Sequence, residues 1–583
     1  MSFLSRIMVL KSQAHFSSGV YNRFGGPSGS LPLEGSRKKK AGQAKSRVGL
    51  LILGFTALYG VIGGRLVEYA MKDPEVVSSI LPPDRLMASR PDILDRNGEV
   101  LATDIRTVSL FAEPNKIVDA DEAIEKLSTI LPDLDVKGTY KKLSVKSSHF
   151  AWLRRQLTPK QQSQILALGI PGIGFRPEKR RFYPGGPTAS HILGYVNIDN
   201  RGVAGMEKYI DDQGLADLAS VGMTSDQPLE PVKLSIDLRV QNIVRDVVIN
   251  AVTNYEAKGA GAVVLNIHTG EVLGMASAPD FDPNNPQEGA KEGWLNRMSN
   301  GTFEMGSTFK TFSTAMALDS GKVSINDSFD ASRPIRIGGF TINDFHGKRR
   351  WLTVPEIFEY SSNIGTAKMI DIVGIELQKE YLTRFGLLTK MQTELPEVKM
   401  PSQPKVWKKI NSVTISFGHG VSTTPLQTAV AGAALVNGGK LIEPTFLPRT
   451  REQADETAEV VVKKSTSDEI RYLFKLNGLK GSGRNADVPG FNVGGKTGTA
   501  DKVVNGRYAN DLNFNAFIAA FPIDNPQYVV LTFCDEPHNG EKGQTIASYT
   551  AAPMVRNIIR RAAPILGIEP QFGEDGSALL VSY

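Results

Sequence analysis

FEMGSTFK, residues 303–310, is the segment on which our interpretation of the whole chain rests. The sequence from Ser307 to Leu318 is apolar at helical spacing, so we expect a helix that begins at the serine, just after Gly306. Ser307 and Lys310, three residues apart, would then share one helix face. A serine hydroxyl is a poor nucleophile, and a neutral lysine beside it is a recognised way to activate it. The segment therefore predicts a nucleophilic serine.

Two further motifs support this interpretation, because S-x-x-K alone often arises by chance, with a serine that only caps a helix and a lysine that points to water. The first is Ser361-Ser362-Asn363 in EYSSNIG, and the second is KTGT, residues 496–499, in VGGKTGTA. The three motifs occur in this order, far apart in the chain, and together they indicate one composite site.

The composition is that of a globular chain with more than one domain: 583 residues, 41% hydrophobic and 22% charged. Part of the net charge of +6 comes from a basic run before residue 48. Since this run adjoins an apolar segment, it fits a membrane flank better than a nucleic-acid site, and we expect no nucleic-acid partner. The single cysteine, Cys534, lies in an apolar run and is expected to be a buried strand residue.

The N-terminal region predicts a membrane anchor. Residues 1–47 form a polar, basic tail, and residues 48–64 are 17 residues without a charge, followed by Arg65. We assign residues 48–69 to an uncleaved transmembrane signal anchor, with the tail in the cytoplasm and the bulk of the chain outside. A cleaved signal peptide is the alternative, but the leader is long and no A-x-A pattern follows the apolar run.

Residues 70–227 are interpreted as a non-catalytic spacer, or pedestal, domain. Residues 90–104 alternate in polarity and are expected to form a hairpin that turns at Asn97-Gly98. Residues 180–186 predict a loop, residues 191–197 a strand and residues 202–211 the start of a helix. We expect Arg180 and Arg181 to pair with carboxylates of this domain.

Residues 228–583 predict an α/β (α+β) domain, with an antiparallel sheet flanked by helices. The expected elements are helices over 235–260, 307–318, 425–436 and 551–561, hairpins over 261–277 and 513–534, and a strand at Lys496. Residues 395–412 and 451–488, which are polar or rich in proline, are expected to be surface insertions.

Together, the three motifs resemble those of class B penicillin-binding proteins, which are membrane-anchored peptidoglycan D,D-transpeptidases. The resemblance extends over residues 48–560 and includes RPDILDRNGEVLA, GVAGMEKYID and FGHGVSTTPLQ. Met305 stands where the family usually has proline, and Pro91 where it usually has glycine. The length fits the septal, cell-division member best and the elongation member next. The resemblance implies the penicillin-binding transpeptidase fold in the bacterial inner membrane, with a periplasmic catalytic domain.

By the same resemblance, Ser307 attacks the penultimate D-Ala carbonyl of a stem pentapeptide, expels the terminal D-Ala and forms an acyl-enzyme. Lys310 is the base, and its burial near Lys496 would lower its pKa in the needed direction. Ser361 relays a proton to the leaving amine, and Asn363 holds Lys310 and the substrate amide.

The KTGT segment is expected to bind the donor peptide. Lys496 and Thr499 would bind the terminal carboxylate, Thr497 would support the strand, and Gly498 would let the substrate backbone lie close. The backbone N–H groups of Ser307 and Thr499 would form the oxyanion hole. An amine of a neighbouring stem peptide then takes the acyl group, and penicillin, as a mimic of D-Ala-D-Ala, labels the serine.

Other functions fit the sequence less well. A β-lactamase shares the motifs but has no use for an anchor and a pedestal, and a β-lactam-sensing receptor would show several membrane spans. A bifunctional glycosyltransferase needs an E-D-x-x-F segment, whereas the one Glu-Asp pair is Glu574-Asp575. We expect no cofactor and no metal, since no two of the seven histidines have metal-ligand spacing. His419 is assigned a structural loop role and His346 an exposed position.

The expected partners follow from the resemblance as well. They are peptidoglycan stem peptides, β-lactams as covalent inhibitors, the inner membrane, a membrane glycan polymerase and other division proteins.

Overall fold

A computed structural model describes residues 53–64, 90–214, 229–289, 294–504 and 506–572. The chain divides into two units, residues 1–85 and 86–583, each described by itself. In the first unit, residues 53–64 form a helix; the remainder of the predicted anchor and the whole N-terminal tail lie outside the described residues. Within the described ranges, no helix is both long enough and apolar enough to cross a membrane.

In the second unit, the pedestal is built on a sheet whose longest strand is β2. Its strands are β1 (Ile93–Leu94), β2 (Val100–Ala112), β3 (Ala151–Leu157), β4 (Ile173–Phe182) and β5 (Val232–Lys233). Strand β2 pairs antiparallel with β1, β3 and β4. The predicted hairpin is confirmed: its turn contains Gly98 at φ +94°, and the carboxylate of Asp95 accepts hydrogen bonds from the backbone of Asn97 and Glu99.

Two predictions within the pedestal were wrong. Residues 180–182 belong to strand β4, because β4 pairs with β2 along its whole length, as far as Phe182 against Thr103. Residues 191–193 are helical rather than extended, in a short helix that Gly194 ends at φ +71°. The pedestal helices are α3 (Ala120–Ile130), α4 (Val136–Leu143), α5 (Pro159–Ala167), η1 (Gly186–Ala189), α6 (Ser190–Leu193) and α7 (Gly205–Asp212).

A buried ionic cluster ties the pedestal sheet to helix α7. The carboxylate of Glu207, fully buried, accepts from the guanidinium groups of Arg90 at 2.8 Å and Arg181 at 2.6 Å. Arg181 also contacts Asp104 at 3.3 Å. The prediction that Arg181 pairs with carboxylates is therefore confirmed, whereas Arg180 donates to a backbone carbonyl, that of Asn284.

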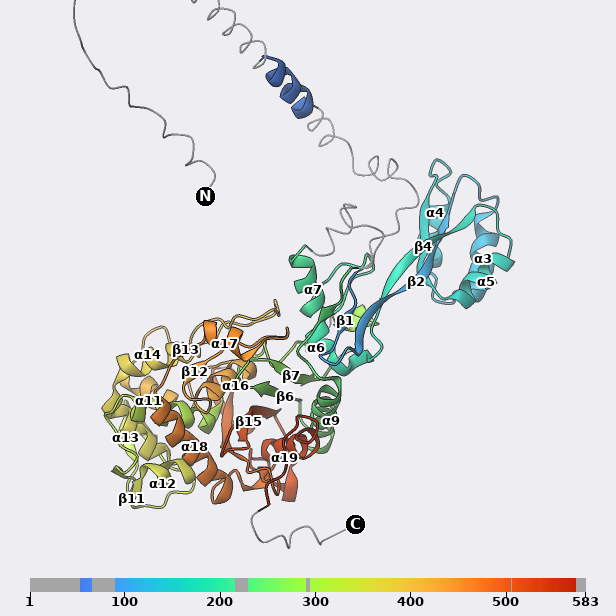
Figure 1. Cartoon of the computed structure of the whole chain (residues 1–583). Helices are drawn as coiled ribbons and strands as arrows, with labels where there is room; N and C mark the ends of the chain where they lie inside the picture. Colours follow the sequence, from blue (N-terminus) through green and yellow to red (C-terminus); the bar gives the residue numbers. More distant parts are fainter. Residues whose placement is uncertain (1–52, 65–89, 215–228, 290–293, 505, 573–583) are drawn as a thin grey trace, which may run out of the picture. The chain divides into compact units, whose positions relative to one another are not determined.

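The larger domain contains a five-stranded antiparallel sheet in the order β14-β15-β16-β6-β7, which confirms the predicted sheet (Figure 1). Its strands are β6 (Gly259–Asn266), β7 (Val272–Ala278), β14 (Gly494–Val504), β15 (Arg507–Phe521) and β16 (Tyr528–Asp535). Strand β14 is an edge of this sheet, and its pairing with β15 is irregular between Asp501 and Lys502. Cys534 is buried in β16, as predicted.

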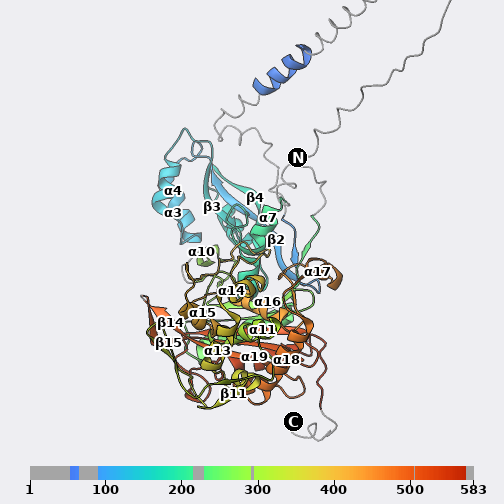
Figure 2. The same cartoon turned by 90° about the vertical axis from the view of Figure 1, so that its left-hand side faces the viewer.

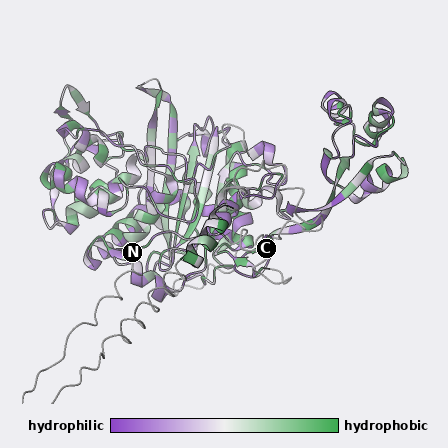
Figure 3. Ribbon diagram, turned by 90° about the horizontal axis from the view of Figure 1, so that it is seen from above, coloured by the Kyte–Doolittle hydropathy of each residue, from purple (hydrophilic) through white to green (hydrophobic). Residues whose placement is uncertain are grey.

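Each face of the sheet carries its own hydrophobic core. Val263 and Leu531 face one core, which includes side chains of α11, α13, α16 and α18, while Val264 and Val530 face the other, with α9 and α19. Figure 1 shows these two groups of helices on opposite sides of the strands, and Figure 2 gives the orthogonal view. In Figure 3 the hydrophobic colour runs along the central strands. The alternation of strand residues thus places helices on both faces.

The remaining elements are helices and short hairpins around this sheet. The helices are α9 (Leu238–Asn254), α10 (Pro286–Gly289), η2 (Gly306–Phe309), α11 (Lys310–Asp319), α12 (Val354–Glu359), α13 (Asn363–Val373), α14 (Ile375–Arg384), α15 (Lys409–Ser416), α16 (Pro425–Ala434), α17 (Arg451–Thr457), α18 (Lys464–Leu479), η3 (Arg484–Ala486), η4 (Glu541–Gly543) and α19 (Ala551–Ala562). The short strands are β8 (Ser328–Asp330), β9 (Ile335–Ile337), β10 (Phe340–Ile342), β11 (Trp351–Thr353), β12 (Lys440–Leu441) and β13 (Glu459–Val460).

Helix α18 corrects the prediction that residues 451–488 are a surface insertion. Ile470, Leu473 and Phe474 on this helix are completely buried in the core that includes α11. These side chains follow helical spacing, so one narrow apolar stripe is enough to pack an otherwise polar helix.

The ionic cluster yields a stability prediction. Glu207→Gln should destabilise the pedestal by about 3–5 kcal/mol, because it leaves the buried Arg90 and Arg181 short of a negative charge. Urea unfolding would measure this change, followed by tryptophan fluorescence in a background in which Trp152 is kept and the other three tryptophans are replaced by phenylalanine. The control is Glu122→Gln, which removes an exposed pair with Lys126 and should cost less than about 1 kcal/mol. Equal unfolding midpoints for the two variants would contradict the prediction.

Candidate active site

The segment with the predicted nucleophile begins as a 3₁₀ turn rather than as an α-helix. Residues Gly306–Phe309 form this turn, and α11 continues directly from Lys310. Ser307 thus lies within the 3₁₀ turn, and Lys310 is the first residue of the helix that follows it. Gly306 has φ +53°, and a side chain there would lie 2.6 Å from the carbonyl oxygen of Thr499. The turn is therefore pressed against strand β14.

Two buried lysines meet at Ser361. The Nζ of Lys310 donates to the carbonyl oxygen of Ser361 at 2.5 Å and to its Oγ at 3.0 Å. The Nζ of Lys496 donates to the same Oγ at 3.0 Å and to the carbonyl oxygen of Thr497 at 3.3 Å. Both lysines are at most 1% exposed. Because Ser361 Oγ accepts from both amines, its own hydrogen remains available to a further acceptor.

Burial changes the protonation of both amines. It lowers the pKa of Lys310 well below that of a free lysine; the charge of Lys496 lowers it further, and that of Asp344 raises it. Burial also lowers the pKa of Lys496 to about 7. Lys310 therefore has a much larger neutral fraction than an exposed lysine at the same pH, which is what a general base requires.

Asn363, the first residue of α13, lies beside this pair but has another partner. Its Nδ2 donates to the carbonyl oxygen of Asn343 at 2.9 Å, while Lys310 donates to Ser361. Asp344, the next residue after Asn343, accepts from Ser362 Oγ at 2.8 Å and from the backbone of Ile364 at 2.9 Å. Sequence reasoning missed Asp344, because nothing in the irregular segment around it marks a residue that would reach this loop.

Strand β14 brings the KTGT segment to the serine. The hydroxyl of Thr497 shares a hydrogen bond of 2.5 Å with Ser482 Oγ, and Thr499 Oγ1 accepts from the backbone of Ala547 at 3.1 Å. At Gly498 a side chain would lie 2.3 Å from the carbonyl oxygen of Met305. The structure thus gives a reason for this glycine besides the predicted approach of substrate: the nucleophile turn packs on it.

The FGHG segment closes the other side of the turn. At Gly418, with φ +92°, a side chain would lie 1.9 Å from the carbonyl oxygen of Gly306. The carboxylate of Glu304 accepts from the backbone of Gly420 at 2.7 Å. The ring of His419 packs edge-on against Tyr508, and burial lowers the pKa of this histidine to about 4.

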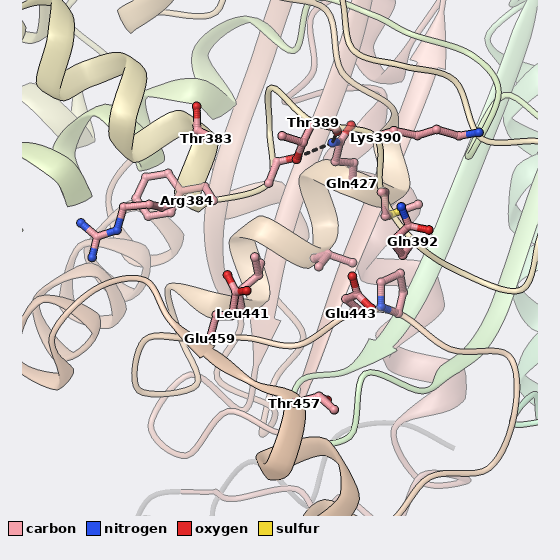
Figure 4. A pocket seen from close by; sticks show the side chains of 15 residues that line it. Thr383, Arg384, Thr389, Lys390, Gln392, Gln427, Leu441, Glu443, Thr457 and Glu459 are labelled. Atoms are coloured by element: carbon pink, nitrogen blue, oxygen red, sulfur yellow. Dashed lines mark hydrogen bonds between the residues drawn. The ribbon is translucent and has the colours of Figure 1, made fainter. Parts of the chain in front are cut away.

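Two pockets of this domain differ in the residues that line them. One, of about 180 Å³, adjoins the nucleophile segment, and its lining includes Glu304, Ala500 and Asp501. The other, of about 220 Å³, is lined by residues of α14, α16 and the strands β12 and β13 (Figure 4). In it, Gln427 Nε2 donates to the carbonyl oxygen of Thr389 at 2.7 Å. None of the predicted site residues lines this second pocket.

The chain therefore brings together a serine at the start of a helix, a buried lysine one turn on, and a second serine between two amines. These groups lie beside an edge strand that can pair with an extended peptide. This is the equipment of a serine enzyme that works through an acyl-enzyme.

Comparisons with known proteins agree with that class. Residues 260–560 match the penicillin binding protein transpeptidase domain, and residues 85–218 match the penicillin-binding protein dimerisation domain. The chain therefore belongs to the class B penicillin-binding proteins.

Several curated proteins are similar to it over most of their length. A probable peptidoglycan D,D-transpeptidase FtsI of Caulobacter vibrioides is 37% identical, over 82% of each chain. A probable peptidoglycan D,D-transpeptidase PenA of Neisseria gonorrhoeae is 32% identical over 93% of this chain and 96% of that one. The crystal structure of penicillin binding protein 3 of Mycobacterium tuberculosis with aztreonam shares the fold, with a TM-score of 0.63 and 24% identity over 84% of this chain and 98% of that one.

The close approach at Gly498 can be tested by substitution. In Gly498→Ala the new methyl group would displace the nucleophile turn, and a displacement of this size typically costs about 100-fold in rate. We expect a loss of that order in acylation by benzylpenicillin, measured by stopped-flow fluorescence, with the fold retained by circular dichroism. Gly185→Ala, where the nearest atom to the new side chain is 3.6 Å away, is the control and should acylate normally. Equal rates in the two variants would contradict this account of Gly498.

Proposed function

We propose that the chain is a peptidoglycan D,D-transpeptidase that cross-links stem peptides during septal wall synthesis. The observation that carries this proposal is the pair of buried amines, Lys310 and Lys496, on Ser361 Oγ beside the Ser307 turn. The similarity to relatives named peptidoglycan D,D-transpeptidase FtsI, from Caulobacter vibrioides and Escherichia coli, supports the reaction and the septal role.

In acylation, Ser307 Oγ attacks the penultimate D-Ala carbonyl as neutral Lys310 takes the hydroxyl proton. The tetrahedral oxyanion is held by the backbone N–H groups of Ser307 and Thr499. When the intermediate collapses, the peptide C–N bond breaks. Ser361 delivers its proton to the departing amine of D-Ala and takes in exchange the proton that Lys310 removed from Ser307, across the hydrogen bond between Lys310 and Ser361 Oγ. Asn363, at the start of α13, orients the substrate amide. The result is an ester of Ser307 and free D-Ala.

The donor peptide binds as an added strand along the free edge of β14. Lys496 and Thr499 bind its terminal carboxylate, and Thr497, held by Ser482, keeps the strand in place. Gly498 keeps this edge close to the turn. A charged Lys496 strengthens the hold on the carboxylate.

In the second half-reaction, the amine of a neighbouring stem peptide attacks the ester and releases Ser307. One amide bond forms as one ester bond breaks, so the step is balanced without an oxidant or a reductant. A β-lactam acylates the same serine, and because its leaving group stays attached, the site remains blocked.

We also propose how the chain is placed in the cell. Residues 48–69 anchor it in the inner membrane with residues 1–47 in the cytoplasm. The pedestal, residues 70–227, carries the transpeptidase domain, residues 228–583, in the periplasm. A membrane glycan polymerase and other division proteins are the expected partners, since cross-linking follows glycan polymerisation.

The mass of the intact protein after reaction with penicillin tests whether Ser307 is the nucleophile. Full-length protein in detergent, incubated with benzylpenicillin, should gain the mass of one penicillin for hours, and Ser307→Ala should gain none. Intact-protein mass spectrometry makes the measurement, with Ser313→Ala, a buried serine of α11 bonded to a backbone carbonyl, as the control that still reacts. An adduct on Ser307→Ala would place the nucleophile elsewhere. Loss of the wild-type adduct within seconds, with penicillin consumed, would indicate a β-lactamase.

The two amines predict a bell-shaped pH dependence of acylation. As pH falls, Lys310 becomes protonated and the base is lost; as pH rises through about 7, Lys496 loses its charge and holds the carboxylate less well. The second-order rate constant for acylation by benzylpenicillin, measured between about pH 5 and 9, should pass through a maximum and fall toward both low and high pH. Lys310→Arg should lose about 10²–10⁴-fold at every pH, because a guanidinium stays protonated. A profile that is flat on the alkaline side would contradict the role of Lys496.

A further inference from the structure

Residues 340–351 form a surface that the mechanism above does not use; we call it the aromatic loop. Three of its aromatic side chains lie largely in solvent: Phe345 is 81% exposed, Phe340 64% and Trp351 63%. Aromatic side chains are enriched at surfaces that bind another molecule, so these exposed rings make the loop a candidate for such a surface.

The same loop carries positive charge. Lys348, Arg349 and Arg350 are consecutive and exposed. Arg350 pairs with Glu356 at 2.6 Å, and Lys348 lies 4.7 Å above the ring of Tyr360. Among the residues that the structure describes, Arg349 has no ion-pair partner, so its charge is available to a ligand.

The aromatic loop is bonded to the active site. Asn343 and Asp344 receive hydrogen bonds from the side chain of Asn363, the hydroxyl of Ser362 and the backbone of Ile364, at 2.8–2.9 Å. Tyr360, under Lys348, directly precedes Ser361. The loop is thus fixed to the segment that handles the proton of the leaving amine.

The proton transfer through Ser361 indicates the side from which the second substrate enters. In acylation, Ser361 gives a proton to the departing amine; in the reverse direction the attacking amine must give its proton to the same group. The acceptor amine therefore approaches the ester from the side of Ser361. The rest of the acceptor peptide then extends over the surface beside the Ser361 segment, where the aromatic loop lies.

We propose that the aromatic loop binds the acceptor strand, which is a second stem peptide. The loop would contact the carboxylates and apolar groups of that peptide. This inference rests on the proposed function and names the site of its second substrate. Charge complementarity selects this occupant: a stem peptide ends in a carboxylate, for which Arg349 is a matched partner. Nearby cations also favour the neutral form of the acceptor amine, which is the form that attacks.

The test separates acylation from transfer. Full-length protein is given a D-Ala-D-Ala pentapeptide donor and, as acceptor probe, a stem tetrapeptide with a free side-chain amine; the cross-linked product and the hydrolysed donor are quantified by mass spectrometry. Arg349→Glu and Phe345→Ala should each lower the ratio of transfer to hydrolysis about tenfold or more. Their rates of acylation by benzylpenicillin should stay within about twofold of wild type. Lys137→Glu, an exposed lysine of the pedestal helix α4, is the control of equal charge change.

A second probe tests the role of charge. The acceptor is now the same tetrapeptide with a C-terminal amide, which lacks the carboxylate that Arg349 would bind. Arg349→Glu should therefore lower transfer to this amide much less than it lowers transfer to the acid. The proposal is overturned if both loop variants transfer like the control, or if Arg349→Glu affects acid and amide acceptors equally. A surface that serves only a partner protein would give normal transfer in vitro and a defect only in cells, which also overturns it. Failure of the proposed function can be told apart from failure of this inference, because wild-type protein would then form no penicillin adduct.

Discussion

Two amines buried around one hydroxyl oxygen are the interaction on which the rest of this molecule depends. A buried cation without a counter-charge is costly, and neither Lys310 nor Lys496 forms an ion pair within the described residues. The protein meets the cost by lowering both pKa values and by supplying oxygen acceptors, including the carbonyl groups of Ser361 and Thr497. Such an arrangement requires an apolar, well-packed surround, which the core that includes α11 and α13 provides.

That rigidity depends on backbone-to-backbone contact. The turn that holds Ser307 touches strand β14 through Gly306 and Gly498 and touches the FGHG segment through Gly418. At each place the missing side chain is what allows the contact. Three segments far apart in sequence thereby meet at Met305 and Gly306, the two residues that directly precede the serine.

Sequence predicted the parts of the site that are written as local motifs, and missed those made by tertiary contact. Ser307, Lys310 and Lys496 could be proposed as site residues because helical spacing and the KTGT segment are local signals. The 3₁₀ form of the first turn was not predicted, because it follows from the packing of Gly306 on β14. Asp344 was missed because its partners lie beyond the irregular segment that contains it.

The same division holds for the fold. The hairpins and the long helices of the larger domain follow from periodicity, and the antiparallel sheet was predicted correctly. The prediction of a surface insertion at helix α18 was wrong, because the apolar stripe of Leu473 and its neighbours is narrow within a polar sequence. In the pedestal, the pairing of β4 with β2 overrode the loop-like composition near residue 182.

The open edge of β14 has a consequence for how copies of this protein behave toward one another. A strand with unpaired backbone groups can pair with the same strand of a second molecule, and proteins crowded at one site would then aggregate through their own active sites. The irregular pairing between Asp501 and Lys502 interrupts the regular ladder just beyond KTGT, where Lys502 pairs with Asp535 and Glu536. The regular part of the edge is thus confined to a short stretch around KTGT, which disfavours pairing with a second molecule.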